Sequence, residues 1–180
     1  MTVERERLIE LLEDSYSAYY NISKENLPAG LPLVFRAEFF KRDERYWLSK
    51  QIPIYGNEEN EYFYLFSAPE FDVKSVSEAV DFALNEALPK VKPHKEHQYT
   101  NVKTLFVADS FSDEAVEFIK KKNFQKSYHF SFWGYSSLIT CGVKTPECTV
   151  FYNRAGATMK SYFSKLLAAE EKNRKKLSQG

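Results

Sequence analysis

Apolar residues recur at helical spacing near the start of the chain. Leu8, Leu12 and Tyr16 share one face of a helix, and acidic side chains fill the opposite face. Thr2 is placed to cap this helix, and the turn-forming residues 26–30 follow it. The pattern predicts an amphipathic first helix that packs one side against a core.

Alternation of apolar and polar residues then predicts a β-hairpin. Residues 34–40 and 45–51 flank the charged segment 41–44, which is typical of a four-residue loop. Residues 61–66 and 102–108 are apolar on both faces, as expected of central strands that are covered on both sides. We therefore expect a hairpin at the side of a buried sheet.

Capping signals predict the helices in the middle of the chain. Ser75 and Glu78 form a capping box before an apolar stripe that ends at Pro89. Ser112 starts another helix, whose last turn carries the lysines at 120–122. These helices alternate with the predicted strands, which is typical of an α/β fold.

Further strands are predicted at 126–133, 137–143 and 148–152, and a last helix begins at Asn153. The resulting order is α-β-β-β-α-β-α-β-β-α. Helices interspersed with hairpins imply a mixed sheet with helices on both faces. The sequence thus predicts a single α/β domain, bordering on α+β.

A length of 180 residues fits one domain. We expect residues 1–169 to be globular and the polar tail 170–180 to be mobile. No apolar run is long enough to cross a membrane, and the charged N-terminus does not match a secretory signal, so a cytoplasmic protein without a membrane partner is expected. The two cysteines, Cys141 and Cys148, are expected to be buried free thiols.

The net charge of zero hides an uneven distribution of charged residues. Residues 1–89 hold 9 basic and 17 acidic side chains, or 9 − 17 = −8, and residues 90–180 hold 16 and 8, or 16 − 8 = +8. Charge separation on this scale predicts distinct acidic and basic surfaces if the two halves fold apart. Such surfaces favour a homo-oligomer in which the two signs meet.

Candidate ligands for a metal ion are His94 and His97, which have the i, i+3 spacing that chelates a metal on a helix. No third ligand is evident nearby, and hydrogen-bonded histidines in a surface loop are favoured instead. We therefore expect neither a metal nor a cofactor.

Two further segments are candidates for ligand contact. Aromatic residues dominate 124–135, where basic residues beside exposed rings would suit single-stranded bases. Alternation within this segment predicts that most rings are buried in a strand and leaves His129 and Trp133 for contact. Asn153 caps a helix start at which Arg154 would strengthen the binding of an anion, although a purely structural cap is favoured.

A resemblance rests on five segments: RYWLSK (45–50), KPHKEH (92–97), QKSY (125–128), WGY (133–135) and YNRAG (152–156). With these segments the chain resembles domain-of-unknown-function family 8052, a group of uncharacterised archaeal and clostridial proteins, over residues 19–163. The resemblance implies a small cytoplasmic protein and supplies no catalytic residues. Tyr135 is a minor departure, since tryptophan is expected there.

The opening order α-β-β-β-α-β also resembles the core of restriction-endonuclease-like nucleases. Those enzymes place an acid on one strand and Glu-x-Lys on the next to hold a divalent metal. Here residues 61–66 offer one acid without the lysine, and Glu38 and Asp109 do not complete the motif. A working nuclease of this kind is disfavoured.

The sequence contains no recognisable catalytic signature, so the catalytic residues are unknown. A non-enzymatic binding or assembly module with segregated charge is the favoured hypothesis. One alternative is a nucleic-acid-binding protein that uses the basic C-terminal half. Another is a metal-dependent hydrolase or an enzyme that acts on a small anion.

Overall fold

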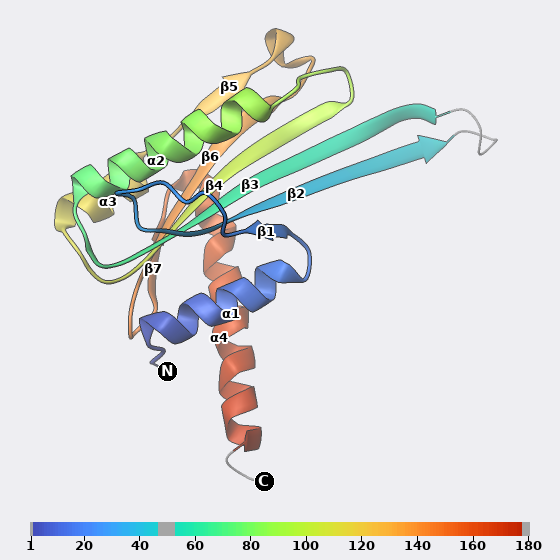
Figure 1. Ribbon diagram of the computed structural model, residues 1–180. Helices are drawn as coiled ribbons and strands as arrows, with labels where there is room; N and C mark the ends of the chain where they lie inside the picture. The colour runs from blue at the N-terminus through green and yellow to red at the C-terminus, as the bar shows by residue number, and fades with distance from the viewer. Residues whose placement is uncertain (1, 47–52, 178–180) are drawn as a thin grey trace.

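The computed structural model describes residues 2–46 and 53–177 of the chain (Figure 1). Residues 47–51 of the second predicted hairpin strand, and with them most of the RYWLSK segment, lie outside the described residues. The helical elements are α1 (Arg5–Ser17), α2 (Val73–Ala87), η1 (Leu88–Lys90), α3 (Asp113–Lys121), η2 (His129–Ser131), η3 (Arg154–Gly156) and α4 (Ala157–Leu177). The strands are β1 (Asn21–Ser23), β2 (Leu33–Tyr46), β3 (Pro53–Phe71), β4 (His97–Phe111), β5 (Gln125–Ser127), β6 (Tyr135–Lys144) and β7 (Thr149–Tyr152).

The strands form one mixed sheet in the order β1-β2-β3-β4-β6-β5, and β7 pairs with the far end of β6. β3, β4 and β6 run parallel, whereas β2 is antiparallel to β3. Helices α2 and α3 lie on one face of this sheet, and α1 and α4 lie on the other (Figure 1). This arrangement confirms the predicted α/β fold with a mixed sheet and helices on both faces.

Alternation along the central strands divides the core into two layers, because successive side chains point to opposite faces. On the α2 face, Phe66 stacks on Phe106 with 5.2 Å between ring centroids. On the α1 face, Tyr16 stacks on Phe63 at 3.9 Å. The predicted strands that are apolar on both faces are therefore confirmed, since each serves both layers.

The prediction of a loop at residues 41–44 is wrong. β2 continues through this segment to Tyr46, and Lys41 and Arg42 face Glu59 and Glu58 across the ladder. Opposite charges directly across an antiparallel pair stabilise it, so a polar composition does not end the strand here. The hairpin is consequently much longer than the alternation pattern suggested.

The strand predicted at 126–133 is also wrong. β5 ends at Ser127, and His129, Phe130 and Ser131 all have positive φ, at 47°, 55° and 70°. The turn closes through backbone hydrogen bonds, among them Tyr128 N–H to the Gly134 carbonyl at 3.0 Å. We call residues 128–134 the aromatic turn. Its rings are not packed as a strand face would pack them.

Helix starts follow the predicted residue types with some shift along the chain. Ser112 caps α3 through a 3.1 Å bond from Ala115 N–H, as predicted. Asp72 rather than Ser75 caps α2, and Ser75 closes the capping box from the third helical position. Glu4 rather than Thr2 precedes α1, where no side chain caps the helix.

α4 extends from Ala157 to Leu177, so the predicted domain boundary at residue 169 falls within a helix. Glu170 is 4% exposed, and its carboxylate lies 3.0 Å from Arg7 Nε on α1. This ion pair holds the part of α4 beyond residue 169 against α1. Mobility of the tail stays a prediction.

The acidic and basic halves of the sequence meet in the fold, because β3 from the first half lies parallel to β4 from the second. Many described ion pairs join one half to the other: Arg5–Asp109, Arg7–Glu170, Lys90–Glu38, Lys103–Glu61 and Lys122–Asp81. The premise that the two halves form separate charged regions therefore does not hold for the described residues.

Neither cysteine is paired, and both are buried, as predicted. None of the described helices has the length and apolar composition needed to span a membrane.

Candidate functional site

A pocket exists where the sheet extends past the helix that covers it. α2 has 15 residues and is about 22 Å long, whereas the 19 residues of β3 span about 63 Å. Pro89 helps to end the helical segment, since it cannot continue the backbone hydrogen bonding. The connection from η1 to β4 then runs beside the uncovered part of β2 and β3.

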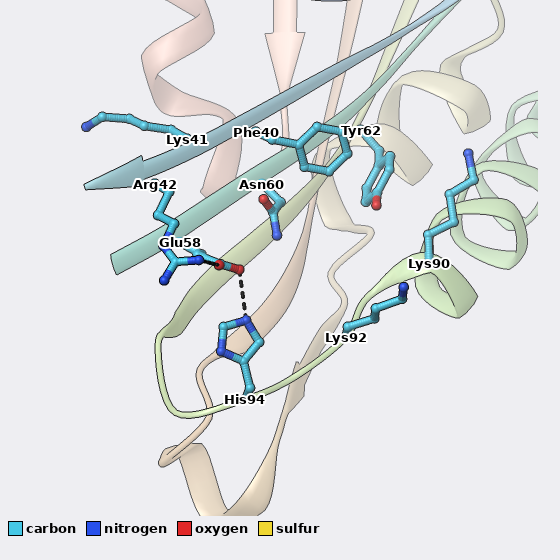
Figure 2. A pocket seen from close by; sticks show the side chains of 9 residues that line it. All are labelled: Phe40, Lys41, Arg42, Glu58, Asn60, Tyr62, Lys90, Lys92 and His94. Carbon is cyan, nitrogen blue, oxygen red and sulfur yellow. Dashed lines mark hydrogen bonds and ion pairs between the residues drawn. The ribbon is translucent and has the colours of Figure 1, made fainter. Parts of the chain in front are cut away.

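The resulting pocket has a volume of about 500 Å³. We call it the basic pocket; it is lined by Phe40, Lys41, Arg42, Glu58, Asn60, Tyr62, Lys90, Lys92 and His94 (Figure 2). The strand residues come from β2 and β3, and the rest come from the connection after α2. Figure 2 shows Lys41 pointing away from the other side chains, whereas Lys92 and His94 approach Glu58, Asn60 and Tyr62 across the pocket.

Glu58 is the one carboxylate in the lining, and it organises one side of the pocket. Its Oε2 lies 2.8 Å from His94 Nε2, and its Oε1 lies 3.6 Å from Arg42 Nη1. Arg42 also reaches Glu96 at 2.9 Å. The guanidinium is therefore held between two carboxylates at the pocket edge, which orients it without burying it.

The other side of the pocket combines a cation with aromatic rings. Lys90 Nζ lies 5.3 Å above the centre of the Tyr62 ring and 2.9 Å from Glu38. Phe40 meets Tyr62 edge to face at 5.9 Å and is 54% exposed. Burial, with the nearby Glu38 carboxylate, raises the pKa of Tyr62. The phenol is thus held neutral beside an accessible apolar ring.

The hydrogen bonds of His94 use both ring nitrogens. Nδ1 accepts the Glu96 backbone N–H at 3.3 Å, so the proton on Nε2 is donated to Glu58. His97 is 3% exposed; its Nδ1–H donates to the Trp133 carbonyl at 2.7 Å, and Nε2 lies 2.8 Å from Thr100 Oγ1. Neither histidine has a free lone pair for a metal. The described residues contain no group of three or more His, Cys, Asp or Glu that could hold one.

The histidines connect the basic pocket to the aromatic turn. Their ring centroids are 6.5 Å apart, and His97 is bonded to the Trp133 carbonyl within that turn. The Trp133 ring is half-buried and stacks on His129 at 4.6 Å. Three predicted site residues, His94, His97 and Trp133, are therefore brought together, although each interacts mainly with protein groups.

Exposed rings flank this junction, contrary to the prediction that the aromatic segment is buried. Phe130 is 91% exposed and Phe132 is 77% exposed. Their exposure follows from the left-handed backbone of the turn, which breaks the strand alternation. The sequence signal for this turn is Gly134. In the structure its φ is +73° and its backbone lies close to the Gln98 carbonyl, and both features require glycine.

The remaining predicted site residues lie at a different cavity. Asn153 is fully buried; its amide donates to the carbonyls of Lys122 and Leu138 at 3.0 and 2.9 Å, and its oxygen accepts Gly156 N–H. Arg154 is exposed and lines a cavity formed by residues 123–125 after α3, by β6 and by η3. Asn153 therefore has no group left for a ligand.

Most residues of the basic pocket are missing from the sequence-based candidates. Phe40 and Tyr62 lie in predicted strands and Arg42 in the predicted loop at 41–44, and their convergence depends on the β2–β3 register and on the end of α2. Lys90 and Lys92 belong to the basic C-terminal half and were not among the named candidates. The signal that could have been used is the basic segment after Pro89. In the structure this segment runs beside β3, which extends past the end of α2.

Comparison with known proteins identifies a family and no closer relative. The model of the domain of unknown function DUF8052 matches residues 4–165. No match was found among curated proteins or solved structures. The match covers almost the whole described fold, including both faces of the sheet and the basic pocket. The chain therefore belongs to the DUF8052 family.

Proposed function

We propose that the protein is a non-enzymatic binding module that takes single-stranded nucleic acid in its basic pocket. The observation that carries this proposal is the exposed ring of Phe40 beside Arg42, Lys90 and Lys92, with one carboxylate in the lining. Single strands are bound by cations that contact phosphates and by rings that stack on bases. The pocket offers both within one cavity.

The neighbouring aromatic turn favours an extended single-stranded oligonucleotide over a single nucleotide as the ligand. Phe130 and Phe132 provide further exposed rings. The exposed Lys126 lies close to them in sequence, and the exposed Lys95 lies two residues before His97, which is bonded to the turn. The contacts of His94 and His97 make the pocket and the turn adjacent. An oligonucleotide with one base at Phe40 would extend toward the aromatic turn.

Each of the carboxylates that a metal-dependent hydrolase would use forms an ion pair with a different basic residue. Glu38 pairs with Lys90, Glu61 with Lys103, and Asp109 with Arg5. Glu38 belongs to the α2 face of the sheet, whereas Glu61 contacts Tyr20 on the α1 side. This separation favours binding over metal-assisted hydrolysis. The nuclease-like core, homo-oligomerisation and a cytoplasmic location stay predictions from the sequence.

The test is fluorescence anisotropy with a labelled oligothymidylate and oligouridylate, alongside a mononucleotide and anionic vesicles. If Arg42, Lys90 and Lys92 contact phosphates, the slope of log affinity against log salt is about −2. Affinity then falls about 20-fold between roughly 50 and 200 mM salt. Lys92→Gln lowers the slope by about 0.7, and Phe40→Ala weakens binding by about tenfold or more.

The matched control is Lys74→Gln, because Lys74 is an exposed lysine at the opposite end of α2. This variant keeps the parent affinity and salt slope. Oligonucleotide binding that neither Lys92→Gln nor Phe40→Ala changes would overturn the assignment to this pocket. An absence of binding at low salt, or binding to vesicles alone, would overturn the proposed ligand.

A further inference from the structure

A second cavity lies on the opposite side of the sheet, between α1 and α4. Its volume is about 300 Å³, and its lining includes Tyr16 and Tyr20 from the first helix region, Met159 and Tyr162 from α4, and Lys103 from β4. This size is at the small end of the range for ligand pockets. The cavity belongs to the α1 face, so the basic pocket does not contribute to it.

Four tyrosines, Tyr16, Tyr19, Tyr20 and Tyr162, make up half of the cavity lining. The rings of Tyr16 and Tyr20 are 4.8 Å apart at 54°, and those of Tyr16 and Tyr162 are 6.1 Å apart at 74°. Tyr162 O–H donates to Ser15 Oγ at 3.0 Å, which ties α4 to α1 across the cavity. These rings contact one another, so the room for a flat apolar group is the cavity that they line rather than a gap between them.

One cation is placed in this aromatic lining. The Lys103 side chain is 17% exposed, and its Nζ donates to Glu61 Oε2 at 2.6 Å. The Tyr20 hydroxyl donates to the same carboxylate oxygen. An ammonium has three donors, and its described hydrogen bonds use one. Lys103 therefore lines the cavity with donor capacity to spare, while Glu61 is already satisfied by two donors.

The chemistry of these groups selects one class of ligand. A cation with spare donors attracts an anion, and ring walls favour a flat apolar body. Glu61 is ion-paired with Lys103 at 2.6 Å, so its carboxylate would repel a doubly charged phosphate more strongly than a monocarboxylate. We propose that the cavity binds a small monocarboxylate with a flat apolar group, its carboxylate on Lys103 and its apolar group against the rings of Tyr16, Tyr20 and Tyr162.

The test uses benzoate as the probe, measured by isothermal titration and by chemical shifts of the tyrosine rings. The neutral isostere benzamide and the cation benzylammonium are the matched ligands. Benzoate binds with a dissociation constant of about 1 mM or tighter, as expected for a ligand of its size, and both matched ligands bind at least tenfold more weakly. Equal binding of benzoate and benzamide would overturn the role of Lys103.

Two variants place the site. Lys103→Met removes the cation and reduces benzoate affinity at least tenfold. Because this change also leaves Glu61 without its ion pair and can impair folding, Thr158→Trp provides a second route: Thr158 is an exposed lining residue, and tryptophan there fills the cavity with the ion pair intact. Benzoate binding that survives Thr158→Trp in a folded protein would overturn the proposal.

The matched control is Lys165→Met, an exposed lysine on α4 outside the cavity lining, which keeps the parent affinity for benzoate. Oligonucleotide binding measured on the same samples separates this site from the basic pocket. Loss of benzoate binding with unchanged oligonucleotide affinity in Thr158→Trp supports an independent second site. Loss of both in a folded variant would overturn that independence.

Discussion

Asn153 offers a sharp test of whether its role is structural. Its amide donates to two carbonyls in separate elements, Lys122 after α3 and Leu138 in β6, and its oxygen caps the start of η3. Asn153→Ala removes the cap, which is worth about 1 kcal/mol, and leaves one buried and one part-buried carbonyl without this donor at about 1 kcal/mol each. We expect the free energy of unfolding to fall by about 3 kcal/mol.

The assay is equilibrium unfolding in urea followed by far-ultraviolet circular dichroism. With a slope of about 2 kcal/mol per molar urea, the midpoint shifts by about 1.5 M. Arg154→Ala is the matched control, since the adjacent side chain is exposed and its loss changes stability by about 0.5 kcal/mol or less. Equal stability of the two variants would refute the reasoning.

Asn153→Asp separates the cap from the two donated bonds. Aspartate keeps the oxygen that caps η3 and loses the amide that donates to Lys122 and Leu138. Its carboxylate would be buried against two carbonyl oxygens, which is unfavourable. We therefore expect Asp to be at least as destabilising as Ala. Recovery of parent stability in Asn153→Asp would show that capping alone matters.

Two further predictions concern the aromatic turn and the buried tyrosines. In Gly134→Ala the new Cβ would lie 2.3 Å from the Gln98 carbonyl oxygen at a φ of +73°, so we expect a loss of about 2–4 kcal/mol in urea unfolding. Gly30→Ala, at a φ of +90° with nothing within 4 Å, costs about 1 kcal/mol, and equal costs would contradict the clash. Burial raises the pKa of Tyr16 and of Tyr64, and burial with a hydrogen bond to Glu61 raises that of Tyr20, so these phenols stay protonated in the folded protein. The unfolded chain releases these protons above about pH 10. The stability that these tyrosines contribute is therefore fully present below that pH and is lost as pH rises beyond it. Urea unfolding at a series of pH values measures this; tyrosinate absorbance that rises fully near pH 10 while the protein stays folded would disprove it.

Local signals predicted the elements whose determinants lie within a few residues. α3 is the clearest case, because Ser112 caps it, acids occupy its first turn and lysines its last. The central strands β3 and β4 were recognisable because both faces of each had to be apolar. β1 was not predicted, since its three residues become a strand only by pairing with β2.

The errors occurred where a distant partner decides the local structure. Residues 41–44 have loop-like composition and become a strand because Glu58 and Glu59 lie opposite. The aromatic turn has strand-like alternation and becomes a left-handed turn that packs Gly134 against β4. The candidate site residues depend on distant partners in the same way. Hydrogen-bonded histidines were favoured over metal ligands at His94 and His97, but the sequence did not show that their ring nitrogens interact with Glu58, Glu96, Trp133 and Thr100.

Taken alone, the sequence determined the α/β class, the two-layered core and the positions of most helices, because periodicity and capping depend on neighbours along the chain. The tertiary structure alone decided which charges meet, how far β2 and β3 extend past α2, and which side chains therefore line each cavity. The physical reason is that ion pairs and cavities arise from strand register and from mismatched element lengths. Those quantities join residues that are tens of positions apart and leave no local periodicity.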